Sequence, residues 1–241
     1  MSLAPRVVAR RAFSLIELLV VLLIVIVLTS LLMPGLRAVR ETANKLSCAS
    51  NLRQIGCATT VYATDHDDRL PFSYFGSPDI RLYSEMMALT TGPTPAAMNK
   101  LDGLGQLLPR GGRYLDCAGC MFCPSHRGEH SLERYQETLD NPMLSSERAF
   151  SNYQYRGDVD PDSGARYRFS NDHDFLIAAD GLRTKSDFNH GNGLNLLHGD
   201  LAVDWVSDVD GSILGSLPEL PLDSQNSLFN ELWNDLIDSD K

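Results

Sequence analysis

A long apolar run follows a basic flank near the start of the chain. At about 1.5 Å per residue, a helix over this run is roughly 31 Å long, close to the hydrocarbon thickness of a bilayer. The pattern therefore predicts a membrane-spanning helix at 13–34. From Phe13 to Met33 the only residues that are not apolar are Ser14, Glu17, Thr29 and Ser30.

The hydrophobic pattern changes after Pro34 and Gly35. From Leu36 to about Asp65 the composition still favours a helix, but apolar residues now return at helical spacing on one face only. We expect this second half of the helix, at 35–65, to pack that face against a soluble head at 66–241. The face, called the core stripe below, consists of Cys48, Leu52, Ile55, Thr59 and Tyr62.

The head shows short strand patterns separated by Asp, Asn and Gly turns. Strands are predicted at 153–155, 175–179, 194–197 and 201–206. Residues 71–109 show no sustained period and predict a loop-dominated insertion with a short helix near 82–89. The fold class is therefore α+β, with a long N-terminal helix packed against a small antiparallel sheet.

Acidic and apolar residues alternate at helical spacing near the C-terminus, which predicts an amphipathic helix at about 226–238. We expect its apolar face to dock on the head rather than on a neighbouring subunit. That face comprises Leu228, Phe229, Leu232, Trp233, Leu236 and Ile237.

Glu17 is a lone acid inside the apolar run. On insertion scales, a carboxylate at the centre of a membrane helix costs about 2.5–3.5 kcal/mol, and less near an end. A cost of this size indicates a function that compensates for it. Basic residues flank the run on both sides, so charge alone gives only a slight preference for an N-terminus inside the cell.

Residues 12–17, Ala-Phe-Ser-Leu-Ile-Glu, resemble the type IV prepilin processing site, normally Gly-Phe-(Thr/Ser)-Leu-Ile-Glu. In that family a membrane peptidase cuts before the Phe and N-methylates it, and the apolar run stays as anchor and filament core. The resemblance implies a pilin-like fold, a leader at 1–12 and a cut between Ala12 and Phe13. It also implies methylation of Phe13 and a role for Glu17 in assembly and methylation. Ala12 replaces the usual Gly, and Pro34 stands where pilins commonly carry a helix-loosening proline.

Three other interpretations of this segment fit less well. A secretory signal peptide has an apolar core of about 7–15 residues followed by a small-residue cleavage site, and this run is longer and lacks one. A twin-arginine signal rests on Arg10 and Arg11 alone. A plain transmembrane anchor leaves Glu17 unexplained.

A second resemblance covers the C-terminal third. His190, nine residues and Asp200 are similar to the H-x9-DG element of one bacterial group of pilin-like proteins. Leu201 replaces the glycine of that element. Because a leucine disfavours the tight turn that the glycine implies, we do not expect that turn here. The segment Asn51-Leu52-Arg53-Gln54-Ile55 also resembles the region after the anchor in this group. For His190 we favour a structural role, bonded to backbone or carboxylate groups, over catalysis.

Five cysteines leave three fates open. Cys48 and Cys57 lie on opposite faces of the helix and about 13 Å apart along it, so they cannot pair with each other. We favour disulfides, with Cys48–Cys123 as the best single pair. Zinc is the first alternative, because Cys117, Cys120, Cys123 and His126 have ligand-type spacing, and free thiols are the second.

Calcium is a further alternative ligand. Asp158, Asp160 and Asp162 place carboxylates at alternate positions, as calcium loops do, and some pseudopilins carry calcium in their heads. However, the glycine comes one residue late and Phe169 stands at the twelfth position. An acidic solvated turn is therefore the favoured interpretation, and no cofactor is required.

The net charge of −10 disfavours nucleic acid as a partner. No nucleophile, phosphate-binding or zinc-protease motif is present, so we do not expect an enzyme. The expected function is a structural prepilin or pseudopilin of a type II secretion or type IV pilus-like filament. Its expected partners are the prepilin peptidase, other pilin-like subunits and the inner membrane, crossed once with the head outside the cytoplasm. The alternative is a membrane-anchored extracytoplasmic protein that binds a ligand or partner.

Overall fold

A computed structural model describes residues 14–77, 79–93, 98–110, 112–160, 164–169, 175–221 and 227–239. The chain divides into two compact units, Met1–Ala43 and Asn44–Lys241, and the second is called the head below. The division falls inside the first helix, α1, which runs from Leu15 to Asp65. The expected leader and the expected cleavage site between Ala12 and Phe13 lie outside the described residues.

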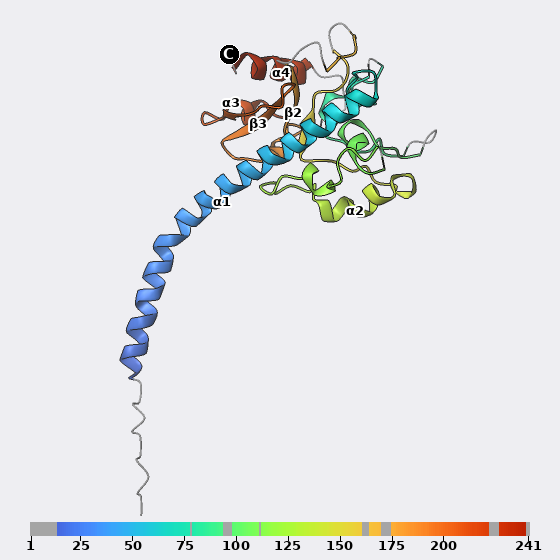
Figure 1. Ribbon diagram of the computed structural model, residues 1–241. Coiled ribbons are helices and arrows are strands. Elements are labelled where there is room, and N and C mark those ends of the chain that lie inside the picture. Colours follow the sequence, from blue (N-terminus) through green and yellow to red (C-terminus); the bar gives the residue numbers. More distant parts are fainter. Residues whose placement is uncertain are drawn as a thin grey trace, which may run out of the picture. The chain divides into compact units, whose positions relative to one another are not determined.

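The N-terminal unit is helical throughout its described part, from Leu15 onwards (Figure 1). Pro34 lies inside the helix without ending it. The apolar side chains here are exposed on all sides, from 45% at Val20 to 79% at Leu15 within Leu15–Leu28. By length and composition this is the one helix, among those described, that could cross a membrane; its most apolar window has a mean hydropathy of 3.1.

The part of α1 inside the head buries the core stripe, as predicted. All five of its residues are at most 7% exposed, and Leu52 and Ile55 are completely buried. Cys57 lies off the stripe and is exposed, which also agrees with the helical phase. Apolar contact with the head, rather than helix propensity alone, therefore stabilises this part of the helix.

The head contains one antiparallel sheet of four strands in the order β1-β2-β3-β4. The four predicted strands are confirmed, with ends that shift by one or two residues. Each strand pairs with the next along the chain, so the order of the strands in the sheet follows the sequence, and only β3 and β4 are joined by a tight turn. The strands are β1 Tyr153–Tyr155, β2 Leu176–Asp180, β3 Gly193–His198 and β4 Val203–Ser207.

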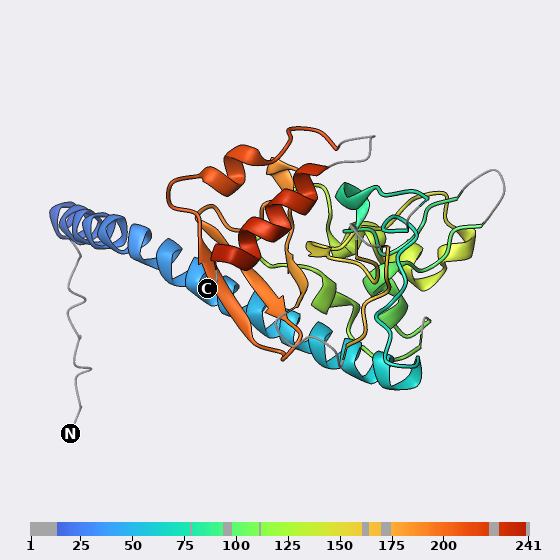
Figure 2. The same ribbon diagram turned by 90° about the horizontal axis from the view of Figure 1, so that it is seen from above.

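Helices cover both faces of the sheet in the head (Figure 2). The head part of α1 lies behind the strands and α4, Ser227–Ser239, lies in front. Because both faces are covered, every residue of β2 and β3 is buried, whereas edge strand β4 is half-buried. On the α1 side, a Cβ added at Gly56 would lie 3.0 Å from Leu201 Cδ2 and 3.1 Å from Leu197 Cδ1. Gly56 therefore permits a close approach of helix and sheet.

The C-terminal helix docks on the head, as expected from its amphipathic pattern. Phe229 is completely buried, and Leu232, Trp233 and Leu236 are at most 7% exposed. These side chains belong to the same apolar core as the sheet.

The structure also contains helices that the pattern does not predict. The longest of these is α2, Leu132–Asp140, whose N-cap Ser131 accepts a hydrogen bond from the Arg134 amide. The short helix expected near 82–89 is a single 3-10 turn. The remaining short helices are α3 Ser212–Ser216 and the 3-10 helices η1 Tyr83–Glu85, η2 Gly103–Leu107, η3 Ala118–Met121, η4 Pro142–Leu144 and η5 Lys185–Asp187.

The tight turn between β3 and β4 forms despite the missing glycine. Leu201 has φ 71°, in the left-handed region where a side chain is unfavourable. Its side chain lies over Gly56 of α1, as described above. The expectation from the Leu201 substitution is therefore wrong, because contact with the helix offsets backbone strain that glycine would avoid.

Candidate functional site

The N-terminal unit presents one charged group at the start of its apolar segment. The Ser14 amide donates to Glu17 Oε2 at 2.9 Å, so the carboxylate caps the first turn of its own helix. The hydroxyls of Thr29 and Ser30 donate to helix carbonyls at 2.9 Å and 2.8 Å. Hydroxyls can thus be satisfied within one helix, whereas a carboxylate in an apolar setting needs a partner of opposite charge.

The head is cross-linked by a disulfide between Cys48 and Cys123, the pair that the sequence favours. Their Cα atoms are 5.4 Å apart, and 75 residues separate them along the chain. The core stripe places Cys48 on the inner face of α1, and η3 leads the chain back so that Cys123 reaches it. The bond ties the helix to the head.

His190 and Asp180 lie beside the disulfide, and both are completely buried. His190 Nε2 is 3.6 Å from Cys123 Sγ and 3.7 Å from Asp180 Oδ2. Ligand-type atoms of Cys48, Cys123, Asp180 and His190 all lie within 4.8 Å of one another. While the two sulfurs are bonded to each other they supply no thiolate, so this group is a buried polar cluster rather than a metal site.

The Asp180 carboxylate is satisfied from within the head. The backbone amide of Asn195 donates to Oδ2 at 2.6 Å and its side chain donates at 2.9 Å. The Asn189 side chain donates to Oδ1 at 3.3 Å. Burial raises the pKa of Asp180, although His190 and these donors lower it. This set of partners supports the structural role expected for His190.

The other member of the H-x9-D element lies elsewhere. Asp200 is exposed and accepts from the Ala202 amide at 2.8 Å, so it shapes the turn that contains Leu201. The element therefore marks two structural positions, a buried histidine before β3 and a turn residue after it, and not one chemical site. Trp205, four residues after Leu201, packs edge-on against His190 at 5.6 Å between ring centroids.

The four residues proposed for zinc do not assemble. Cys123 is bonded to Cys48, which removes it from any thiolate set. His126 donates from Nδ1 to Asn189 Oδ1 at 3.0 Å, and its Nε2 is buried without a hydrogen-bond partner. Only Cys117 and Cys120 remain as neighbouring free thiols. The four residues therefore have three separate roles: Cys123 forms a disulfide, His126 bonds to an amide, and Cys117 and Cys120 are free thiols.

The three aspartates proposed for calcium are described only in part. Asp162 lies outside the described residues. Asp158 is buried and accepts from Arg166 at 2.6 Å and from the Ser73 amide at 3.1 Å, while Asp160 accepts from the Tyr167 hydroxyl at 3.1 Å. Burial raises the pKa of Asp158. Both described carboxylates are thus bonded to protein donors. The favoured interpretation, an acidic solvated turn, is wrong for Asp158, which is buried and paired with Arg166, and the calcium hypothesis stays a prediction.

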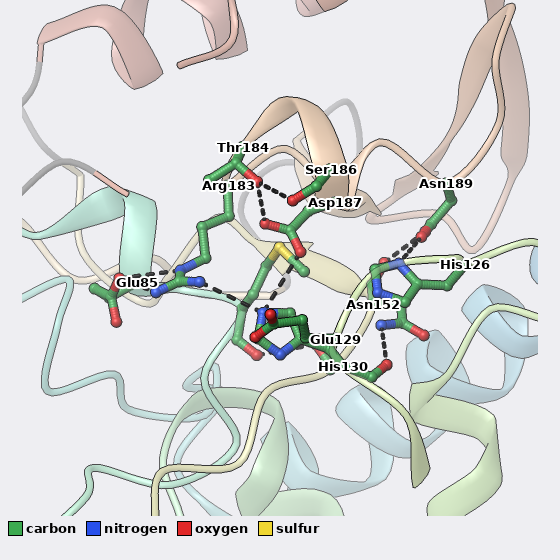
Figure 3. A network of polar contacts seen from close by, with 12 residues as sticks. Glu85, His126, Glu129, His130, Asn152, Arg183, Thr184, Ser186, Asp187 and Asn189 are labelled. Atoms are coloured by element: carbon green, nitrogen blue, oxygen red, sulfur yellow. Dashed lines mark hydrogen bonds and ion pairs between the residues drawn. The ribbon is translucent and has the colours of Figure 1, made fainter. Parts of the chain in front are cut away.

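A buried ionic network links segments outside the sheet (Figure 3). Glu85, in η1, accepts two hydrogen bonds from Arg183 at 2.8 Å and 3.0 Å and another from Arg148. Arg183 Nη1 also lies 3.4 Å from His130 Nε2, which is 3.5 Å from Asp187 Oδ1. Burial lowers the pKa of His130, an effect that Asp187 opposes and Arg183 reinforces.

Two asparagines connect this network to the disulfide cluster. Asn152 donates to the His130 carbonyl at 2.9 Å, and Asn189 donates to the Asn152 carbonyl at 2.7 Å as well as to Asp180. The sequence offers no signal for this network, because its members are far apart along the chain and have no characteristic spacing. Its geometry holds loops together, with each charged group facing an opposite or neutral partner.

Comparisons with family models, with curated proteins and with solved structures find no match to this chain.

Proposed function

We propose that the chain is a prepilin-like structural subunit. A peptidase would release residues 1–12, and the apolar start of α1 would anchor the subunit in the inner membrane before entering the core of a type II secretion or type IV pilus-like filament. The observation that carries this proposal is the single carboxylate, Glu17, near the start of a helical segment at 15–33 whose apolar side chains are exposed.

The physical argument rests on the partner that Glu17 needs. Its carboxylate caps its own helix through Ser14, which leaves its negative charge unbalanced within the segment. In a filament core, the free or methylated amine at Phe13 of a neighbouring subunit would balance that charge. A lone buried carboxylate is costly and a paired one much less so, so the pairing would favour addition of each subunit in a fixed register.

The head fits the same role. It is a disulfide-linked unit whose described polar groups are largely bonded within the chain. Other pilin-like subunits would then be the main partners of the head. The prepilin peptidase would act on the N-terminal segment.

Substitution of Glu17 tests the proposal in the native host. Glu17→Ala and Glu17→Gln should leave the subunit in the membrane fraction but abolish its recovery in filaments, because neither side chain carries the charge. Ser30→Ala is the matched control, since that hydroxyl bonds only to its own helix among the described residues. Normal filament recovery of both Glu17 variants would contradict the role assigned to Glu17. Absence of the unsubstituted chain from any filament, with the chain still in the membrane fraction, would support a simple membrane-anchored binding protein.

A further inference from the structure

Two free cysteines of the head are paired in space. Cys117 is exposed and Cys120 is buried, and neither belongs to the disulfide. Cys117 immediately precedes the 3-10 helix η3, and the Cys120 amide donates to the Cys117 carbonyl at 3.1 Å. Residues three apart in such a turn lie on the same side, with Cα atoms less than about 7 Å apart. This is the range in which a disulfide can close.

The two thiols have different surroundings. Cys120 Sγ donates to Gln54 Oε1, on α1, at 3.3 Å. Burial, followed by contact with the Cys117 side chain, raises the pKa of Cys120 to about 12. The exposed Cys117 is the thiol that an external reagent meets first.

A surface cavity adjoins this pair. Its volume is about 460 Å³, and its lining includes Asp116, Ala118 and Gly119, which surround Cys117 in the sequence. A Cβ added at Gly119 would lie 3.5 Å from Cys117 Sγ and 3.7 Å from Leu132 Cδ2, and Leu132 also lines the cavity. Gly119 thus lies close to both the Cys117 thiol and Leu132, although neither cysteine itself lines the cavity.

We propose that Cys117 and Cys120 form a reversible dithiol–disulfide site that exchanges with an external disulfide. The Cys117 thiolate attacks one sulfur of the external disulfide, forms a mixed disulfide and releases the first thiol. Cys120 then loses its proton and attacks Cys117 Sγ, which closes the Cys117–Cys120 bond and releases the second thiol. Two electrons pass from the protein to the external disulfide, and the two thiol protons balance the two thiols released.

This site is separate from the Cys48–Cys123 bond, which is buried beside His190 and Asp180. Its chemistry does not depend on the proposed function. Only the location of the head outside the cytoplasm, where external disulfides are available, rests on the proposed function. Failure of N-terminal processing would therefore leave the exchange result unchanged, and the two proposals can fail independently.

Titration with glutathione tests the site. The full-length chain in detergent is equilibrated with increasing ratios of oxidised to reduced glutathione, quenched with acid, alkylated and mapped by mass spectrometry. The Cys117–Cys120 peptide should lose two hydrogen atoms and become protected from alkylation, while Cys48–Cys123 remains intact throughout. Cys57→Ser serves as the background, because it removes the other free thiol.

Two variants separate the steps of the exchange. Cys120→Ser should accumulate a stable glutathione adduct on Cys117, because the second thiol is missing. Cys117→Ser should leave Cys120 unmodified, because it is buried. If the unsubstituted pair instead keeps a stable adduct on Cys117, or stays reduced at the most oxidising ratio, the proposal is wrong. Retention of one zinc ion per chain by the reduced pair would also overturn it.

Discussion

The two parts of α1 differ in where their apolar side chains lie. In the N-terminal unit they surround the helix and are exposed, as Leu22 is at 54%, whereas in the head they form one stripe that is buried, as Leu52 is at 0%. A helix that is apolar on all sides needs an apolar environment such as lipid or other helices. A helix with one apolar stripe needs only its own domain. The two parts of α1 therefore require different environments, although they belong to one helix.

The acids of the two parts differ in the same way. Asp180 in the head is surrounded by donors from Asn189 and Asn195, while Glu17 has the Ser14 amide of its own helix. The head therefore satisfies its buried charge internally. The proposed assembly role assigns the charge of Glu17 to a partner on a neighbouring subunit.

Removal of the disulfide should have the largest effect on the head. The bond closes a separation of 75 residues, for which chain entropy predicts a stabilisation of about 4 kcal/mol. The double variant Cys48→Ala/Cys123→Ala should lower the free energy of unfolding by roughly that amount, measured by tryptophan fluorescence in denaturant. Cys57→Ser is the control and should leave the midpoint unchanged. Equal midpoints for both variants would show that the bond does not tie the helix to the head.

A matched pair of truncations compares the two parts of α1 directly. Leu52→Ala removes a completely buried side chain and should destabilise the head by about 2–5 kcal/mol. Leu22→Ala removes an exposed one and should change the unfolding of the head by less than about 0.5 kcal/mol. Trp205 and Trp233 both lie in the head, so their fluorescence reports this unit. Similar losses in the two variants would contradict the division of the helix.

Asp102 is a buried acid in the head, and its pKa shows the effect of burial on stability. Burial raises its pKa from 3.8 to about 6, against donors such as the Tyr74 amide and the Ser73 hydroxyl. The folded head thus favours the protonated form. The stability from this group is present below pH 4 and is lost as pH rises towards 6. A shift of this size corresponds to about 3 kcal/mol.

Asp102→Asn should remove that loss, because an amide carries no charge, can accept from the Tyr74 amide through Oδ1 and can donate from Nδ2 to the Ser73 hydroxyl oxygen. The stability difference between variant and parent should grow in favour of the variant from pH 4 to pH 6 and then level off. Denaturant unfolding at several pH values measures it. Parallel pH profiles of variant and parent would mean that burial does not raise the pKa of Asp102 in the folded head.

Leu201 gives the smallest expected effect. Leu201→Ala and Leu201→Gly both lose the contact over Gly56, but only glycine relieves the left-handed backbone at φ 71°. The glycine variant should therefore be more stable than the alanine variant by about 1 kcal/mol. Thermal unfolding of the two variants side by side measures the difference, and a more stable alanine variant would contradict the strain.

The repetitive elements could be predicted from the sequence because each depends on local periodicity. The core stripe, the four strands and the C-terminal helix follow from spacings of two or of three and four residues. Cys48–Cys123 was the favoured pair because Cys48 lies on the stripe. The turn at Leu201 could not be predicted, because its backbone strain is offset by a contact with Gly56, far away in the sequence.

The buried network could not be predicted, for the same reason. Glu85 and Arg183 meet only after η1 and the segment beyond β2 are brought together by the sheet, and neither residue has a motif. Helix α2 was also missed. It is short, and a serine such as its N-cap Ser131 is common in loops, so it does not by itself predict the start of a helix.

The most direct test of the central claim is the mass of the mature N-terminus. Intact and peptide mass spectrometry of the protein, purified from its own membranes, identifies the first residue and any methyl group. The account predicts a chain that starts at N-methylated Phe13. A chain that still starts at Met1, or one cut near Gly35, would contradict it.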